Sequence, residues 1–237
     1  MMSNAVDRTY AYPPPRYPAH LVASRRLPDG TDIVIRPIRP DDDAIERAFI
    51  SGLSRETAYN RLFSGRKLTP DEIRHLTRVD YDREMAFVAV TDNDGQARLL
   101  GVARYVKDAD GSGAEFALVV ADAWQHKGVG RLLLDTLLRH AHTVGIGRLH
   151  GITLATNQAM QNLARKLGFV QKHDPHDATV RQVEKTLALG VSPAAAYATA
   201  AFRTVAAAND DNIALSDPPR MPQSVKDGTQ NNQAGAS

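Results

Sequence analysis

The sequence predicts a single mixed α/β domain, in which a mostly antiparallel twisted sheet is flanked by helices. Strand and helix signals alternate between residues 30 and 188, which is typical of mixed folds. Three successive strand signals within that range are joined by turn sequences, which favours antiparallel pairing. The chain has 237 residues, of which 43% are hydrophobic, enough for one domain of ~150 residues with appendages.

Both ends of the chain differ in composition from this domain. Residues 1–29 begin with a proline-rich stretch that lacks apolar periodicity, so we expect a flexible arm. Within residues 189–237, Ser192-Pro193 is a typical helix start, and an alanine-rich stretch follows it. From Ser216 onward the chain is polar, and we expect a disordered tail.

The first half of the domain predicts one strand and three helices. The alternating segment 32–38 predicts a half-buried strand, and Pro40-Asp41 begins a helix that reaches Phe49. A second helical segment covers 54–63. Thr69 and Glu72 form a capping box, so a third helix should run to about Val79.

The middle of the domain predicts an antiparallel meander. Its strands cover 84–91, 98–106 and 114–120. Asp92-Asn93-Asp94-Gly95 is a hairpin turn between the first two, and a second polar turn containing glycine precedes the third.

The last part of the domain predicts helices that pack on the sheet. An amphipathic helix covers 128–142, and a strand follows at 149–154. A further helix is expected at 157–167. Gly168 follows it, and a glycine in the left-handed conformation is a common helix terminator. A last strand is expected at 179–187.

Composition excludes several function classes. A formal charge of +2, from 29 basic and 27 acidic residues, is too balanced for a dedicated nucleic-acid binder. The absence of cysteine excludes disulfide scaffolds, thiolate metal sites and cysteine nucleophiles. No apolar run approaches the ~20 residues that cross a bilayer, and no secretory signal is recognised. We therefore expect a cytoplasmic protein without a nucleic-acid or membrane partner.

No metal site is expected either. Asp108 to Gly113 resembles the start of a calcium loop, but the required glutamate is replaced by Val119, so a hairpin turn is favoured. His173 and His176 lie in a polar segment without further ligands at metal-site spacing.

The most informative segment joins a strand to the amphipathic helix. Gly128 and Gly130 allow a tight turn in which backbone N–H groups converge at a helix start, an arrangement that binds anions. Lys127 and Arg131 add positive charge. Neither a P-loop nor a dinucleotide fingerprint fits the spacing, and glycines that serve only the turn remain an alternative.

This segment also carries a family resemblance. The run Gln125-His126-Lys127-Gly128-Val129-Gly130 resembles the (Gln/Arg)-x-x-Gly-x-(Gly/Ala) pyrophosphate loop of the GNAT superfamily of N-acetyltransferases. The segment from Asn157 to Leu167-Gly168-Phe169 resembles a second motif of that family, in the right order and spacing. The resemblance covers residues 30–188 and implies the GNAT fold, with acetyl-CoA as co-substrate.

A narrower resemblance implies which class of molecule accepts the acetyl group. Residues 76–89 are similar to bacterial protein-lysine acetyltransferases that modify acyl-CoA synthetases. This implies acetylation of protein lysines, with an acyl-CoA synthetase as partner. A small-molecule amine acetyltransferase is the alternative, and a non-catalytic acyl-CoA-sensing module is an alternative of another class.

The resemblance also implies roles for individual residues. Glu115 is the best candidate for the catalytic glutamate, the general base, and a solvent-facing residue on an alternating strand is the less favoured alternative. Asn157 would bind the cofactor arm, or would only cap a helix. Ala164 stands where many members carry a tyrosine that protonates the leaving thiolate. The expected cofactor-binding residues are Leu118, Val119, Val120, Gln125, His126, Lys127, Gly128, Val129, Gly130, Arg131 and Asn157.

Overall fold

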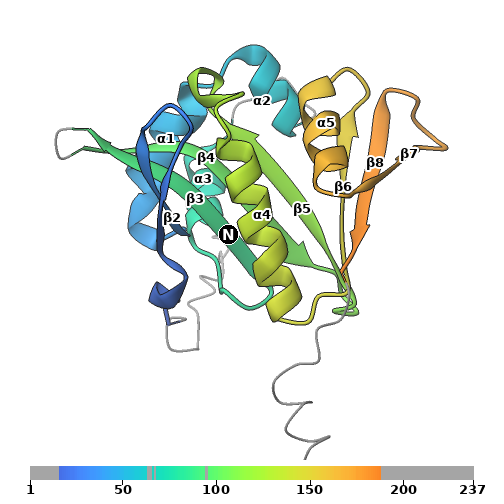
Figure 1. Ribbon diagram of the computed structural model, residues 1–237, viewed down its shortest axis with the longest axis horizontal. Helices are drawn as coiled ribbons and strands as arrows, with labels where there is room; N and C mark the ends of the chain where they lie inside the picture. The colour runs from blue at the N-terminus through green and yellow to red at the C-terminus, as the bar shows by residue number, and fades with distance from the viewer. Residues whose placement is uncertain (1–15, 63–65, 67, 94–95, 188–237) are drawn as a thin grey trace, which may run out of the picture. The chain divides into compact units, whose positions relative to one another are not determined.

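The computed structural model describes residues 16–62, 66, 68–93 and 96–187 of the chain. Within these residues, eight strands form one mixed sheet with helices on both faces, which confirms the predicted fold class (Figure 1). No helix in this part of the chain is long and apolar enough to span a membrane. The alanine-rich helix and the polar tail expected at residues 189–237 lie outside the described residues.

The sheet is antiparallel at every junction but one. Its spatial order is β1 (Ala23–Arg26), β2 (Asp32–Pro37), β3 (Glu84–Asn93), β4 (Gln96–Lys107), β5 (Gly113–Val120), β6 (Arg148–Leu154), β8 (Val180–Thr186) and β7 (Val170–His173). The expected meander is confirmed as β3, β4 and β5. The exception is the parallel pair of β5 and β6.

The first edge of the sheet differs from the sequence-based expectation. Residues 16–29 fall in the segment expected to be a flexible arm, yet β1 pairs with β2 along its whole length. Leu27 is buried in the core, and Gly30, at φ 88°, turns the chain back toward β2. Four strand residues carry too little apolar periodicity to be recognised alone, and the pairing with β2 stabilises them.

Three helices cover one face of the sheet. They are α1 (Asp43–Ser51), α2 (Arg55–Leu62) and α3 (Pro70–Thr77). Thr69 and Glu72 form the expected capping box at the start of α3. A core cluster beneath these helices includes Phe49 of α1 together with Val88 and Val102 of the sheet.

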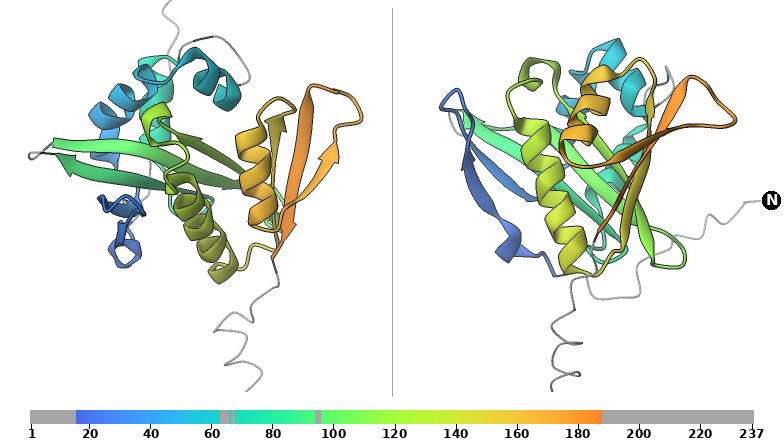
Figure 2. Two further views of the ribbon diagram at one scale, coloured as in Figure 1. Left: turned by 45° about the horizontal axis from the view of Figure 1, so that its top comes forward. Right: turned by 45° about the vertical axis from the view of Figure 1, so that its right-hand side comes forward.

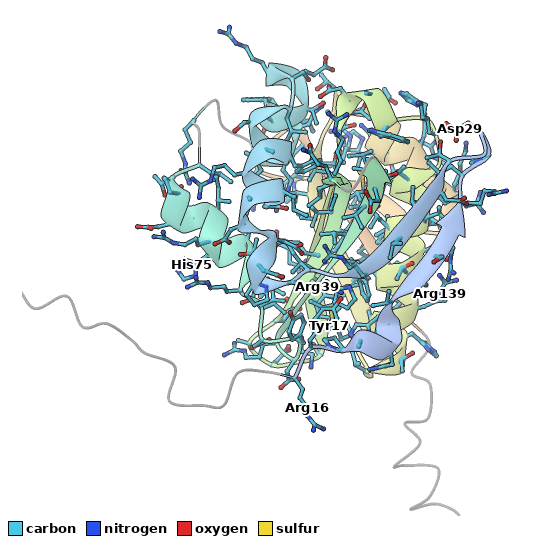
Figure 3. The ribbon with its side chains drawn as sticks, turned by 90° about the vertical axis from the view of Figure 1, so that its left-hand side faces the viewer. Arg16, Tyr17, Asp29, Arg39, His75 and Arg139 are labelled. Atoms are coloured by element: carbon cyan, nitrogen blue, oxygen red, sulfur yellow. The ribbon has the colours of Figure 1, made fainter. Side chains whose placement is uncertain are left out.

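A buried ion pair anchors the start of α1 to the sheet. The two terminal guanidinium nitrogens of Arg36 on β2, Nη1 and Nη2, each donate to Asp42 at 2.7 Å. Both side chains are less than a tenth exposed. Asp42 also accepts the backbone N–H of Arg39. The Arg39 guanidinium lies 4.9 Å from the Tyr17 ring centroid, and Figure 3 shows the two side chains together. The first turn of α1 is therefore fixed against β2.

The opposite face carries the other two helices. The helix α4 (Val129–Thr143) crosses the sheet (Figure 1). The leucines of α4 that are buried against the sheet are Leu133, Leu134, Leu137 and Leu138. The helix α5 (Gln158–Lys166) lies beside β6 and ends before Gly168, whose φ of 80° confirms the expected terminator. The larger core cluster lies between these helices and the sheet.

A half-buried histidine lies against this cluster. His140 of α4 stacks on Tyr105, with ring centroids 6.0 Å apart, and meets Phe87 edge-on at 5.6 Å. Its Nε2 has no hydrogen-bond partner in the described part of the chain. Burial lowers the pKa of His140 from 6.5 to about 4, and the positive charges of His20 and Lys107 act in the same direction.

We predict that His140 makes folding sensitive to mild acid. Because the unfolded chain takes up this proton near pH 6.5 and the folded chain only near pH 4, stability is lost as pH falls through that interval. His140→Leu should remove about 2 kcal/mol of the difference in stability between pH 7 and pH 4.5. Urea unfolding at pH 7 and pH 4.5 measures it, with His142→Leu at an exposed position of the same helix as control. Equal pH dependence in the wild type and His140→Leu would contradict the prediction.

Candidate functional site

The site begins where two parallel strands separate. β5 and β6 pair at only three positions, Gly113 with Arg148, Ala114 with Leu149, and Glu115 with His150. On its other edge β6 pairs with β8 along its whole length, and β5 pairs with β4 as far as Val120. The left-hand view of Figure 2 shows β6, β8 and β7 diverging from the meander. The β6-facing edge of β5 therefore has no strand partner after Glu115 among the described residues.

Close contacts mark the point of divergence. A Cβ atom added to Gly151 would lie 2.9 Å from the carbonyl oxygen of Phe116, so only glycine allows the two backbones this approach. The ring of Phe116 packs on that of Phe169, with centroids 5.0 Å apart. Past these contacts, β5 borders a cavity.

This cavity, here named the cofactor cavity after the ligand expected from the sequence, has a volume of about 440 Å³ and a cationic lining. It is formed by β5, the loop before α4, the start of α4, α2 and α5. Arg61, Arg131 and Lys166 line it, and none of its lining residues is acidic. An anionic ligand would meet no repelling carboxylate there.

Nine of the eleven residues expected to bind the cofactor line this cavity. They are Leu118, Val119, Val120, Gln125, His126, Gly128, Gly130, Arg131 and Asn157. The other two do not. Val129 is fully buried in the core, and Lys127 lies 4.7 Å from the Trp124 ring centroid and 3.9 Å from Asp29.

The loop leads the chain directly into the first turn of α4. Gly128 has φ 93°, a left-handed conformation that favours glycine, and it occupies the N-cap position without any side-chain cap. The N–H of Leu132 donates to the Gly128 carbonyl, which leaves the preceding amides of the first turn without an intrahelical acceptor. Such unpaired amides, together with the helix dipole, form a binding site for an anion.

Two polar side chains hold the loop in place. Gln125 donates from Nε2 to the Val120 carbonyl at 3.2 Å and to Thr57 Oγ1 at 3.1 Å. Asp122 accepts from the backbone N–H of Ser54 and from the hydroxyl of Thr57, so α2 is attached to the loop. This attachment brings Arg61 to the cavity, a residue that the sequence analysis did not identify. Nothing in the motif itself could have indicated it.

Asn157 has a structural role that the sequence left open. Its Oδ1 accepts the backbone N–H of Met160 at 3.0 Å, so it is an N-cap of α5. It lines the cavity as well. Lys166, at the end of the same helix, is a further cationic residue that the sequence analysis missed.

Glu115 lies on the other face of β5. Phe116 and Leu118 point into the core below α4, whereas Val119 packs in the cluster below α1. By strand alternation Glu115 shares the face of Ala117 and Val119. Its side chain is exposed, and its register partners are Val106 on β4 and His150 on β6.

A second cavity, here named the α1 pocket, lies on that same face. It has a volume of about 310 Å³ and is walled by α1, α2, α3, β4 and β5. Arg61 and Val119 line both cavities, so the two are neighbours. The walls are mostly apolar, but Glu46 and Arg104 also line the pocket. The sequence analysis did not identify either residue.

Comparison with known proteins finds relatives among the acetyltransferases. Residues 54–169 match the model of the acetyltransferase (GNAT) family. An acetyltransferase from Pseudomonas aeruginosa is 36% identical over 164 residues, which are 69% of this chain and 87% of that protein. Acetyltransferase Pat from Mycolicibacterium smegmatis is 31% identical over 158 residues, 65% of this chain but only 46% of that protein.

The solved structures include a similar isolated domain. The GNAT domain of S. lividans PAT superposes with a TM-score of 0.65 at 29% identity, covering 72% of this chain and 99% of that domain. The chain thus spans the whole of that domain and about half of the Pat protein from Mycolicibacterium smegmatis.

We predict that Gly130→Val narrows the cofactor cavity. A Cβ atom at this position would lie 3.4 Å from both Leu163 and Val120, so further methyl groups would crowd the lining. Calorimetric titration with coenzyme A should show affinity reduced about tenfold or more. Thr143→Val, at the exposed end of the same helix, is the control and should bind normally. Unchanged affinity in Gly130→Val would mean that the ligand binds elsewhere.

Proposed function

Because the chain belongs to the GNAT family of acetyltransferases, we propose that it transfers the acetyl group of acetyl-CoA to lysine side chains of proteins, with Glu115 as general base. The observation that carries the proposal is the cofactor cavity, which has an acid-free lining and adjoins both the uncapped start of α4 and the open edge of β5. Glu115 lies on the same strand, on the opposite face of the sheet.

The cofactor would bind in two parts. Its pyrophosphate would accept hydrogen bonds from the amides at the start of α4, with Arg131 and Lys166 adding charge. Its pantetheine arm would lie along the unpaired edge of β5, between Leu118 and Val120. A backbone N–H of that edge would polarise the thioester carbonyl and stabilise the negative charge that forms on its oxygen.

The amine must lose two protons in this reaction. A lysine ammonium, with a reference pKa of ~10.4, first becomes a neutral amine, and its nitrogen loses a second proton as the C–N bond forms. We assign this second proton to Glu115, transferred through water. The C–S bond breaks, and coenzyme A leaves as a thiolate. Ala164, fully buried on α5, has no proton to donate, so we propose that the thiolate is protonated by water.

Two observations favour a protein acceptor. Residues 76–89 resemble the protein-lysine acetyltransferases, and this segment includes the end of α3 beside the α1 pocket. The relatives from Mycolicibacterium smegmatis and S. lividans carry the name Pat. An acyl-CoA synthetase is therefore the protein substrate we propose, and a small-molecule amine is the alternative.

The acceptor can be identified directly. The purified chain is incubated with acetyl-CoA and an acyl-CoA synthetase, and mass spectrometry then searches for acetyl-lysine. Modified lysines are the expected result. Acetylation of free amines without modification of the protein would favour the small-molecule alternative. Binding of acetyl-CoA without transfer to any amine would indicate a sensing module.

We predict that Glu115→Gln lowers turnover about 100-fold or more, because the amide cannot accept the proton. Binding of acetyl-CoA should persist, because Glu115 does not line the cofactor cavity. Steady-state kinetics and calorimetry measure the two quantities. Glu184→Gln on β8 is a matched control, since it removes a carboxylate that is partly exposed and salt-bridged to Lys172. Normal turnover in Glu115→Gln would exclude it as the base.

A further inference from the structure

The α1 pocket contains a buried carboxyl group. Glu46 of α1 is 3% exposed. Its Oε2 is completely buried and has no hydrogen-bond partner among the described residues. A buried polar atom without a partner costs free energy, which a ligand with a matching donor would recover.

The shape of the pocket restricts that ligand. Its apolar walls include Phe49 and Ile50 of α1, Leu76 of α3 and Val102 of β4. His75, which also lines the pocket, is exposed on α3, and Figure 3 shows it at the surface. A ligand could therefore enter from solvent beside α3. Such a pocket fits an unbranched aliphatic chain. The chain would end in a hydrogen-bond donor for the Glu46 carboxyl group.

The pocket adjoins the position expected for the thioester. Val119 lines both this pocket and the cofactor cavity, and Ala117 of the same strand lines the pocket. Glu115 follows on the same face, one strand repeat of ~6.6 Å from Ala117. An amine held near Glu46 would thus have the acyl carrier beyond β5 and the proposed base along it.

We propose that the α1 pocket is the acceptor site, and that Glu46 binds the acceptor amine and takes its first proton. This inference rests on the proposed function and deepens it, because it names the acceptor class. The acceptor is a primary amine on an unbranched aliphatic stem, as in a lysine side chain.

The two carboxylates then account for both protons. The ammonium gives one proton to the Glu46 carboxylate and becomes a neutral amine. The nitrogen lone pair attacks the thioester carbon, the C–N bond forms, and the second proton passes through water to Glu115. The C–S electron pair leaves with sulfur as the thiolate, and both carboxylic acids return their protons to solvent.

The burial of Glu46 favours this first proton transfer. Burial raises the pKa of Glu46 to about 7, and Asp42 acts in the same direction, while Arg104 and Arg61 oppose it. The Glu46 carboxyl thereby becomes a better proton acceptor at neutral pH. The two guanidinium groups also disfavour an ammonium ion, and a nearby cation is a recognised means of lowering the pKa of an amine. Glu72 and His75 are the remaining charged or titratable groups that line the pocket.

Glu46→Gln tests the inference with the full chain. The acceptors are a lysine peptide and n-butylamine, which carries the same stem and amine. We expect kcat/KM for either acceptor to fall about tenfold or more, with unchanged affinity for acetyl-CoA. Because Glu46 must be ionised to act, wild-type kcat/KM should decline as pH falls below about 7, and the variant should lose this limb. Glu46→Asp should recover part of the activity.

Two controls separate this role from a structural one. Glu56→Gln makes the same change at an exposed position on α2 and should leave both rates unaltered. The thermal midpoint of Glu46→Gln should equal or exceed that of the wild type, because an unpaired buried charge has been removed. A loss of activity therefore could not be ascribed to unfolding.

Each outcome decides one of the two proposals. If Glu46→Gln acetylates both acceptors within about twofold of the wild type, the inference is wrong. If the wild type modifies n-butylamine but no lysine peptide, the proposed protein acceptor is wrong, and the n-butylamine arm alone decides the role of Glu46. If the wild type modifies neither, calorimetric titration with n-butylamine decides it, and equal binding by wild type and variant overturns the inference.

Discussion

The separation of β6 from β5 after three paired positions is the constraint on which the site depends. β4 occupies one edge of β5 up to Val120, and β8 occupies β6 throughout its length. These ladders use the far edges of the two strands, so the edges of β5 and β6 that face each other after Glu115 have no strand partner among the described residues. The backbone groups on this edge of β5 are therefore available to hydrogen-bond a ligand.

The same strand divides the site into two sides. Because side chains alternate along β5, Leu118 packs toward α4, whereas Ala117 and Val119 line the α1 pocket. A cofactor on one side and an acceptor on the other could thus approach each other across a single strand. The helices complete the two sides with different chemistry. The start of α4 offers unpaired amides, and α1 offers a buried carboxyl group.

Packing far from the cavity determines where these groups lie. The paired side chains of Arg36 and Asp42 fix the first turn of α1 against β2, and Glu46 follows one helical turn later. Asp122 binds the start of α2 and so brings Arg61 between the two cavities. Each of these two contacts joins two different secondary-structure elements. Each orients a charged residue, although Arg36, Asp42 and Asp122 themselves line neither cavity.

The sequence alone determined what depends on near neighbours. Gly168 ends a helix, Thr69 caps another, and the glycine loop marks the start of α4, since each depends on φ, ψ and hydrogen bonds within a few residues. Tertiary structure decided the rest. β1 exists because β2 pairs with it, Lys127 lies beside Asp29, and Glu46 is buried because the sheet lies beneath α1. Burial and pairing arise between residues distant in the chain, which local periodicity does not encode.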